Sequence, residues 1–118
     1  MISLKQADTG TIDQALAELL EEVGFLPKKG KGIFIKPNVV IGTGDAGIIT
    51  APRVVESLLK LFAGYPITIC ERSAVGVSTT EALERSGYGE LALRYGAQLM
   101  DLSRAPRTGV TWARGRLL

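Results

Sequence analysis

The stretch Gly32-Ile33-Phe34-Ile35-Lys36-Pro37-Asn38-Val39-Val40 decides how the rest of this 118-residue chain is interpreted. Its apolar run is short, branched and aromatic, with turn residues on both sides, and this pattern predicts a buried strand rather than a helix. Pro37 ends the strand, because proline has no N–H to donate to a neighbouring strand. The strand therefore carries the amine of Lys36 and the amide of Asn38 at its carboxyl end, where α/β proteins place their binding sites.

Length and composition indicate a single globular domain over residues 1–118. Hydrophobic residues make up 46% of the chain and charged residues 22%, which is ordinary globular usage and argues against disorder. The net charge of +2 is too small to indicate a nucleic-acid partner. No apolar run approaches membrane-spanning length and the first residues lack a signal-peptide profile, so the expected location is cytoplasmic, without a membrane partner.

The cysteine and histidine counts restrict the chemistry. The chain has one cysteine, Cys70, and no histidine. One such chain can form no internal disulfide, no zinc site of Cys and His ligands and no cysteine-ligated iron–sulfur cluster. Histidine acid–base catalysis is excluded as well. These counts indicate no metal site of Cys and His ligands and leave any cofactor unknown, and Cys70, within an apolar run, is interpreted as a core residue.

Helical spacing of apolar residues recurs between the apolar runs. Thr11 with Gln14, and Ser78 with Glu81, have the form of capping boxes, and Thr50 is interpreted as an N-cap ahead of Pro52. Helices are predicted from Ile12 to Val23, from Pro52 to Phe62, from Ser78 to Gly87 and from Glu90 to Tyr95.

Apolar runs with strand character alternate with these helices. Besides the first quoted stretch they are Ile2–Leu4, Ile67–Cys70, Ala97–Leu102 and, in the tail, Val110–Ala113. Connections of this length imply parallel pairing. The predicted fold is a three-layer α/β domain with a mainly parallel sheet of four or more strands and helices on both faces.

Parallel strands end at one edge of the sheet, so three polar segments are expected to converge there. The candidate ligand-binding residues are Lys36, Asn38, Thr50, Glu71, Ser73 and Asp101. Lys36 would hold a carboxylate or phosphate of a ligand, or form an ion pair with Glu71 or Asp101. Glu71 and Asp101 would be paired carboxylates for proton transfer or magnesium, or simply partners of nearby cations.

Two of these candidates have a simpler interpretation. Asn38 after proline is ordinary turn chemistry, and a ligand contact is the less direct explanation. Thr50, with the free N–H groups of its helix, either binds an anion or only caps that helix.

The ordered series of motifs resembles the prokaryotic family named domain of unknown function 362. The residues that carry the resemblance, over about Ile2 to Leu118, are Lys36–Asn38, Thr50–Pro52, Glu71, Ser86–Tyr88, Gly96 and Asp101. Family domains usually continue further, with a later lysine- and histidine-bearing motif, which implies that this chain matches the N-terminal part of a longer domain. Some relatives are fused to iron–sulfur ferredoxin modules, and the family bears a distant similarity to nickel-cofactor lactate racemases.

These patterns support three hypotheses about function, none of which names a reaction. The first is an α/β domain that binds an anionic small molecule at the carboxyl ends of its strands. The second is a non-catalytic assembly module, with a C-terminal strand edge that pairs with another copy of the chain or another protein. The third, which the resemblance alone implies, is a part of an iron–sulfur-associated redox enzyme.

Overall fold

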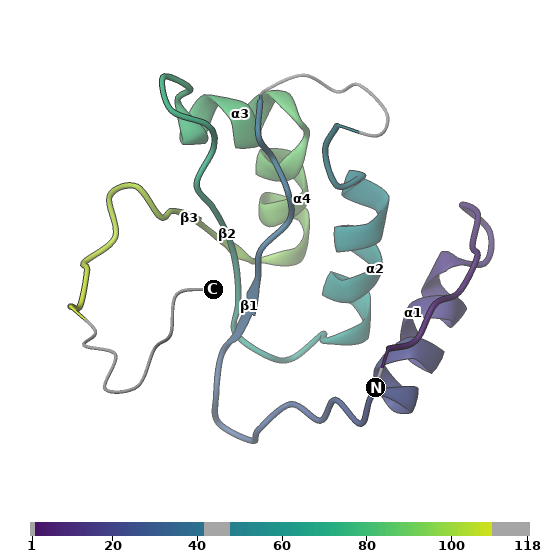
Figure 1. The fold of residues 1–118 in the computed structure, drawn as a ribbon. Helices are drawn as coiled ribbons and strands as arrows, with labels where there is room; N and C mark the ends of the chain where they lie inside the picture. Colours follow the sequence, from purple (N-terminus) through teal and green to yellow (C-terminus); the bar gives the residue numbers. More distant parts are fainter. Residues whose placement is uncertain (1, 42–47, 110–118) are drawn as a thin grey trace, which may run out of the picture.

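The computed structural model describes residues 2–41 and 48–109 and contains a three-stranded parallel sheet with four helices (Figure 1). The elements follow one another as α1 (Ile12–Glu22), β1 (Ile33–Ile35), α2 (Pro52–Leu61), β2 (Ile67–Glu71), α3 (Thr79–Arg85), α4 (Tyr88–Tyr95) and β3 (Gln98–Asp101). The α/β class and the parallel pairing predicted from the sequence are confirmed.

The sheet has three strands in the order β1-β2-β3 rather than the predicted four or more. The expected strand at Ile2–Leu4 does not form. That segment instead lies against α1, where the Lys5 ammonium contacts the Glu18 and Glu22 carboxylates at 2.7 and 2.8 Å. Ile2 and Leu4 remain exposed. Three residues that alternate between apolar and polar do not form a stable strand without a neighbouring strand to pair with. The expected strand at Val110–Ala113 lies outside the described residues.

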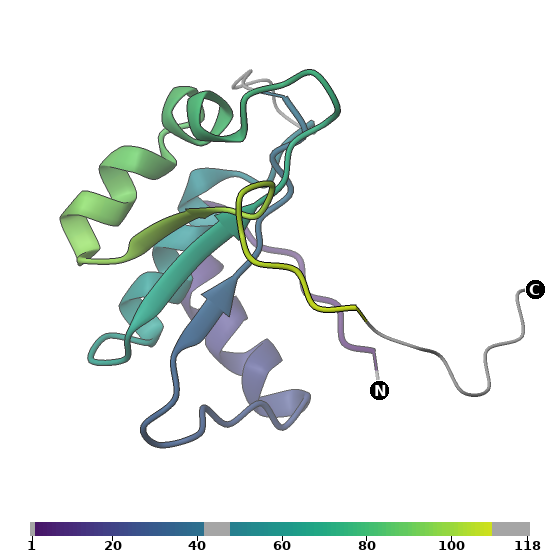
Figure 2. The same ribbon diagram turned by 90° about the vertical axis from the view of Figure 1, so that its left-hand side faces the viewer.

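The helices that cover the sheet lie on one face of it, not on both as predicted. Figure 2 shows α2, α3 and α4 on the same side of the strands. The strands lie in the sheet in the order in which they occur in the sequence. When each crossover connection between such strands is right-handed, all the connecting helices lie on the same face of the sheet. Accordingly, Ile33 and Ile35 of β1 are buried while Phe34 between them is 66% exposed.

The core lies between this sheet face and helices α2 to α4. Its buried members are Ile33, Ile35, Val39, Val55, Leu59, Phe62, Ile67, Ile69, Ala82, Leu83, Tyr88, Leu91 and Ala92. Gly87 and Gly96 bracket α4 with φ angles of 84° and 67°, a left-handed conformation that strains other residues, so each can stop or start a helix where a side chain could not.

Helix α1 packs on α2 and contributes no fully buried residue. Asp13 of α1 holds the contact: its carboxylate lies 3.2 Å from Arg53 Nη2 and 3.5 Å from Lys60 Nζ, and it accepts a hydrogen bond from Ser57 Oγ. The predicted capping box of Thr11 and Gln14 is wrong, since Thr11 donates to Asp8 and Gln14 pairs with Glu18.

Candidate functional site

The carboxyl ends of the three strands lie side by side, as predicted. Ile35 of β1 pairs with Ile69 of β2, and Glu71 of β2 pairs with Asp101 of β3. Lys36 follows β1 directly, so its side chain leaves the strand next to the end of β2. The register therefore gathers Lys36, Glu71 and Asp101 at one edge of the sheet, which we call the carboxyl edge.

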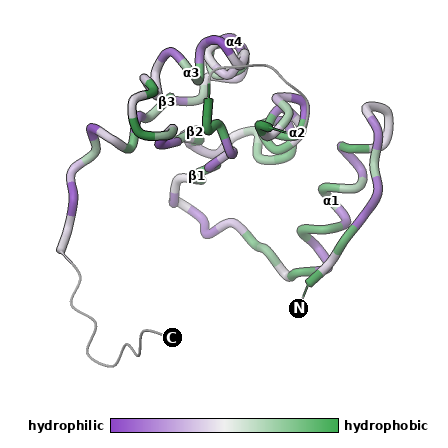
Figure 3. The backbone as a smooth tube through the Cα atoms, turned by 45° about the horizontal axis from the view of Figure 1, so that its top comes forward, coloured by the Kyte–Doolittle hydropathy of each residue, from purple (hydrophilic) through white to green (hydrophobic). Residues whose placement is uncertain are grey.

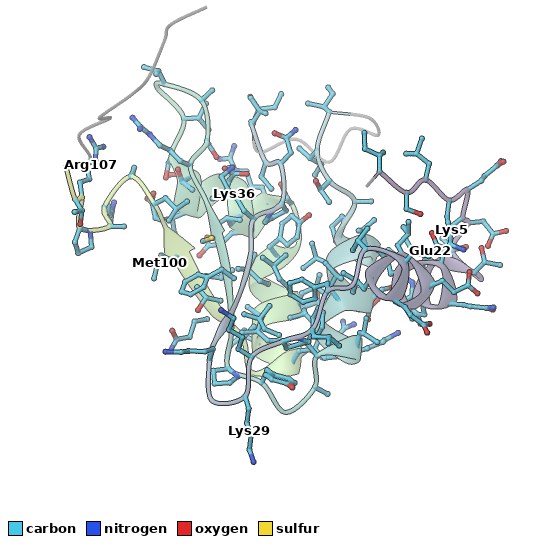
Figure 4. The ribbon with its side chains drawn as sticks, turned by 60° about the horizontal axis from the view of Figure 1, so that its bottom comes forward. Lys5, Glu22, Lys29, Lys36, Met100 and Arg107 are labelled. Atoms are coloured by element: carbon cyan, nitrogen blue, oxygen red, sulfur yellow. The ribbon has the colours of Figure 1, made fainter. Side chains whose placement is uncertain are left out.

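Lys36 and Glu71 form an ion pair across this edge. The Lys36 Nζ lies 2.6 Å from Glu71 Oε1. The Glu71 side chain is 3% exposed, whereas that of Lys36 is 57% exposed, so the carboxylate is inside the domain and the ammonium reaches it from the surface. The ion-pair alternative for Lys36 is thus realised, and Figure 4 shows where Lys36 lies on the domain.

Backbone groups complete the environment of Glu71. The N–H of Arg72 donates to Oε1 at 2.6 Å, and the N–H of Val39 donates to Oε2 at 3.1 Å. Burial acts to raise the pKa of Glu71, but the bonds from Lys36 and these two N–H groups outweigh it, and the pKa lies below its ordinary value. Glu71 is therefore an ionised anchor, not an available proton acceptor.

Ser73 binds the carbonyl of Val39, the residue whose N–H is bonded to Glu71. Its Oγ donates to the carbonyl oxygen of Val39 at 2.7 Å, and its N–H donates to Thr79 Oγ1 at 3.1 Å. Val39 is thus held at its N–H by Glu71 and at its carbonyl by Ser73. The two side chains fix the path of the chain after β1 against the end of β2.

Asn38 and Thr50 bind each other instead of projecting into a pocket. The Asn38 N–H donates to Thr50 Oγ1 at 2.9 Å, the Thr50 N–H donates to the Asn38 carbonyl at 2.8 Å, and Asn38 Nδ2 donates to the Ile48 carbonyl at 3.2 Å. The predicted N-cap role of Thr50 is wrong, because Ala51 occupies that position ahead of Pro52.

Tyr88 connects the bonded pair of Asn38 and Thr50 to the core. Its hydroxyl donates to the Thr50 carbonyl at 2.5 Å, and burial, with a smaller contribution from the charge of Glu71, raises the pKa of the Tyr88 phenol to about 12. A phenol held neutral in this way positions the start of α2. It offers no titratable group near neutral pH.

Asp101 closes its own turn after β3. Its Oδ1 accepts from Ser103 Oγ at 2.6 Å and from Ser103 N–H at 2.8 Å, and these bonds, led by the hydroxyl, lower the pKa of Asp101. Its Oδ2 lies 3.7 Å from Arg104 Nε. Glu71 and Asp101 are neighbours in the sheet register, but each carboxylate has its own donors, so both ionise and neither activates the other.

A hollow of about 240 Å³ opens beside these strand ends. Its walls are the segment from Arg72 to Val77 together with Thr79 and Ser103. Arg72 is exposed, and within the described part of the chain no carboxylate forms an ion pair with it. Arg72 is not among the candidate residues predicted from the sequence, although its position just past the end of an apolar strand is a signal that could have found it.

The loop on the wall of this hollow is a tight turn. The Val77 N–H donates to the Ala74 carbonyl at 3.0 Å, and Gly76 has a φ of 83°, as the third position of a type II turn requires. Ser78 Oγ then accepts from the Glu81 N–H at 3.4 Å and starts α3 as predicted. Among the described residues, the N–H groups of Val75 and Gly76 have no hydrogen-bond acceptor.

Acidic residues do not assemble into a metal site at this edge. Within residues 2–41 and 48–109, no three of the His, Cys, Asp and Glu side chains lie close enough to hold an ion together. The donors around Glu71 and Asp101 are N–H, ammonium and hydroxyl groups, and they are already bonded to these two carboxylates. A magnesium ion would have to displace the Lys36 ammonium from Glu71.

A family model described as domain of unknown function (DUF362) matches residues 33–117. The chain belongs to this family. No curated protein and no solved structure gives a match to it. No helix in the part of the chain that the structure describes is long and apolar enough to cross a bilayer.

The DUF362 match places the carboxyl edge inside the family region. It begins at Ile33, the first residue of β1, and so includes every candidate residue from Lys36 to Asp101 as well as Arg72. Helix α1 and the connector up to Gly32 come before it. The strand-tip architecture therefore lies in the part of this chain that matches the family model.

Proposed function

We propose that this DUF362 domain binds an anionic small molecule at the carboxyl edge of its sheet. One observation carries the proposal: Arg72 lines the hollow beside the strand ends and has no carboxylate partner among the described residues. An arginine at such a position offers up to five N–H donors in a planar fork that fits a carboxylate or phosphate.

The charge balance of this edge supports an anionic ligand. Lys36 is offset by Glu71, and Arg104 lies next to Asp101. Among the described residues, Arg72 has no carboxylate partner that offsets its charge. The ligand would meet the Arg72 guanidinium together with the N–H groups of Val75 and Gly76, which supply backbone donors of the kind that bind anions in turns.

Lys36 is the second cation that this proposal assigns to the ligand. Its ammonium has three N–H donors and is more than half exposed, so the bond to Glu71 leaves donors that face solvent. Under this proposal Glu71 and Ser73 are positioning residues. Glu71 orients Lys36, and both Glu71 and Ser73 hold the Val39 backbone. Asn38 and Thr50 support the same loop, and Asp101 shapes the turn that brings Ser103 to the hollow.

The test is a calorimetric titration of the protein with phosphate, pyrophosphate and citrate, repeated on Arg72→Gln. The matched control is Arg85→Gln, an exposed arginine on α3 that pairs with Glu81. We expect at least one anion to bind and Arg72→Gln to weaken its affinity by roughly tenfold, the size of one charge-assisted contact. Equal binding by the two variants, or no binding of any of the three anions, would refute the proposal.

One observation favours the alternative of an assembly module. β3 stands at the edge of the described sheet, and an edge strand is a template for pairing with another chain. The expected tail strand lies outside the described residues and gives no further support. Sizing chromatography tests the form of this alternative in which the module pairs with another copy, since such a module must form a dimer or larger species and an anion-binding domain need not.

A further inference from the structure

The end of the sheet opposite the carboxyl edge carries an exposed apolar surface. It lies where the connector from α1 enters β1, near the end of α2, and we call it the amino-edge surface. Its exposed apolar members are Phe25, Leu26, Phe34, Leu61 and Tyr65, and its basic members are Lys28, Lys29 and Lys31. Leu26 is 84% exposed, a large cost for a leucine without a partner. Exposed apolar groups gathered in this way mark interaction sites.

Two adjacent hollows lie in this surface. One, of about 370 Å³, lies between α1, the end of α2 and the connector, with Leu20, Leu61 and Tyr65 in its walls. The other, of about 330 Å³, lies between the connector and the start of β1, with Phe34 in its wall. Phe25, Leu26 and Pro27 line both. Each hollow has room for one or two large side chains of a partner.

Three lysines follow the apolar part of the connector. Figure 3 shows a hydrophobic stretch after α1 that gives way to a hydrophilic one before β1. Lys28 and Lys31 line the hollow next to Phe34, and Lys29 extends away from the body of the domain (Figure 4). Within the residues described, none of the three forms an ion pair, in contrast to Lys5, Lys36 and Lys60.

We propose that the amino-edge surface binds an acidic, amphipathic segment of a partner protein. Apolar side chains of that segment would fill the two hollows, and its Asp or Glu residues would face Lys28, Lys29 and Lys31. Charge complementarity supports this occupant, since an uncompensated group of like charges beside an apolar hollow selects a partner of the opposite sign. Glu21 lines only the hollow on the α1 side, so the acidic end of the partner lies over the β1 side.

The chain itself offers poor alternatives to this occupant. Residues 102–118 contain four arginines and no Asp or Glu, so like charges oppose their binding beside the lysines. In a second copy, Glu18 and Glu22 of α1 are already engaged by Lys5. A membrane surface is a weaker match than a protein segment, because two concave hollows receive individual side chains whereas a bilayer requires protruding ones.

The experiment is selection of a phage-displayed library of random 16-residue peptides on the full chain. Selected peptides are then titrated against Leu26→Asp, against the triple variant Lys28→Gln/Lys29→Gln/Lys31→Gln, and against Leu93→Asp. Leu93 on α4 is 87% exposed and lies outside both hollows, which makes it a matched control for Leu26. Phosphatidylserine vesicles serve as the membrane probe, and sizing chromatography of the free protein tests a second copy as occupant.

We expect enriched peptides in which Asp or Glu stands beside Leu, Phe or Trp. Leu26→Asp should weaken their affinity at least tenfold, the triple lysine variant should weaken it and remove its dependence on salt, and Leu93→Asp should leave it unchanged. No enrichment, enriched peptides without acidic residues, or equal losses in Leu26→Asp and Leu93→Asp would each overturn the proposal. So would a Leu26-dependent dimer, or vesicle binding that Leu26→Asp abolishes.

Discussion

The two ends of the β-sheet differ in how far their side chains are engaged by other groups of the domain. At the carboxyl edge the polar groups of Lys36, Asn38, Glu71 and Ser73 are bonded to one another or to the backbone nearby. At the amino edge the apolar side chains around Leu26 are exposed and the lysines beside them have no carboxylate partner among the described residues.

This difference separates residues that build the domain from residues that are available to a ligand. A polar residue at a strand tip is a good candidate from sequence, but its donors are used up when it is bonded to its neighbours. Among the described residues at the carboxyl edge, the Arg72 guanidinium, the exposed side of the Lys36 ammonium and the N–H groups of Val75 and Gly76 are left free. We therefore expect substitutions of the bonded residues to act on stability and substitutions of the free ones to act on binding.

The largest expected effect is the loss of stability in Glu71→Gln. Removing the charge of a carboxylate that is 3% exposed breaks its ion pair and weakens the bond to the Val39 N–H. We expect the free energy of unfolding to fall by about 2–3 kcal/mol. Urea unfolding followed by circular dichroism measures it, with Glu84→Gln as a control on the exposed surface of α3. Similar losses in the two variants would contradict the anchoring role of Glu71.

The next effect is a pH dependence that belongs to Glu71. The pKa of a free glutamate is 4.5, and that of Glu71 in the folded protein is lower. Its stabilising contribution is therefore complete above pH 4.5 and disappears as the pH falls through the lowered pKa. The difference in unfolding free energy between the wild type and Glu71→Gln should be constant from pH 7 to 5 and shrink below that. A difference that grows on acidification would mean that the pKa of Glu71 is raised.

A smaller effect is expected from the partner of Glu71. Lys36→Met leaves the carboxylate bonded to two N–H groups, and the lysine is more than half exposed, so solvent screens the pair. We expect a loss of about 1 kcal/mol. Lys28→Met at the amino edge should change the unfolding free energy by less than about 0.5 kcal/mol. Equal losses in these two lysine variants would remove the distinction between the two edges.

Much of the fold follows from the sequence because it depends on local patterns. The strand around Ile33–Ile35, the helix after Pro52 and the parallel pairing all come from apolar spacing and turn residues. The absent strand at Ile2–Leu4 shows the limit of this reasoning. A short alternating segment forms a strand only beside another strand, and the ion pairs of Lys5 with α1 hold this one elsewhere.

The site is harder to predict, since the final state of each group depends on contacts distant in sequence. The convergence of Lys36 and Glu71 follows from their positions at two strand ends. Two other hydrogen bonds depend on how the loops after the strands fold against each other. They are the bond from the Asn38 N–H to Thr50 Oγ1 and the bond from the Val39 N–H to Glu71 Oε2. The position of Arg72 past a strand end is visible in the sequence, but only the structure shows that Lys36 and Glu71 are bonded to each other while no described carboxylate pairs with Arg72.

The most direct test of the anion site compares the two positively charged edges in one experiment. The protein is labelled with ¹⁵N and its amide spectrum is recorded during titration with pyrophosphate. Binding at the carboxyl edge predicts saturable shifts for Arg72, the turn from Ala74 to Val77 and Ser103, which disappear in Arg72→Gln. Saturable shifts centred on residues 28–32 instead, with the turn after Arg72 unmoved, would contradict the account.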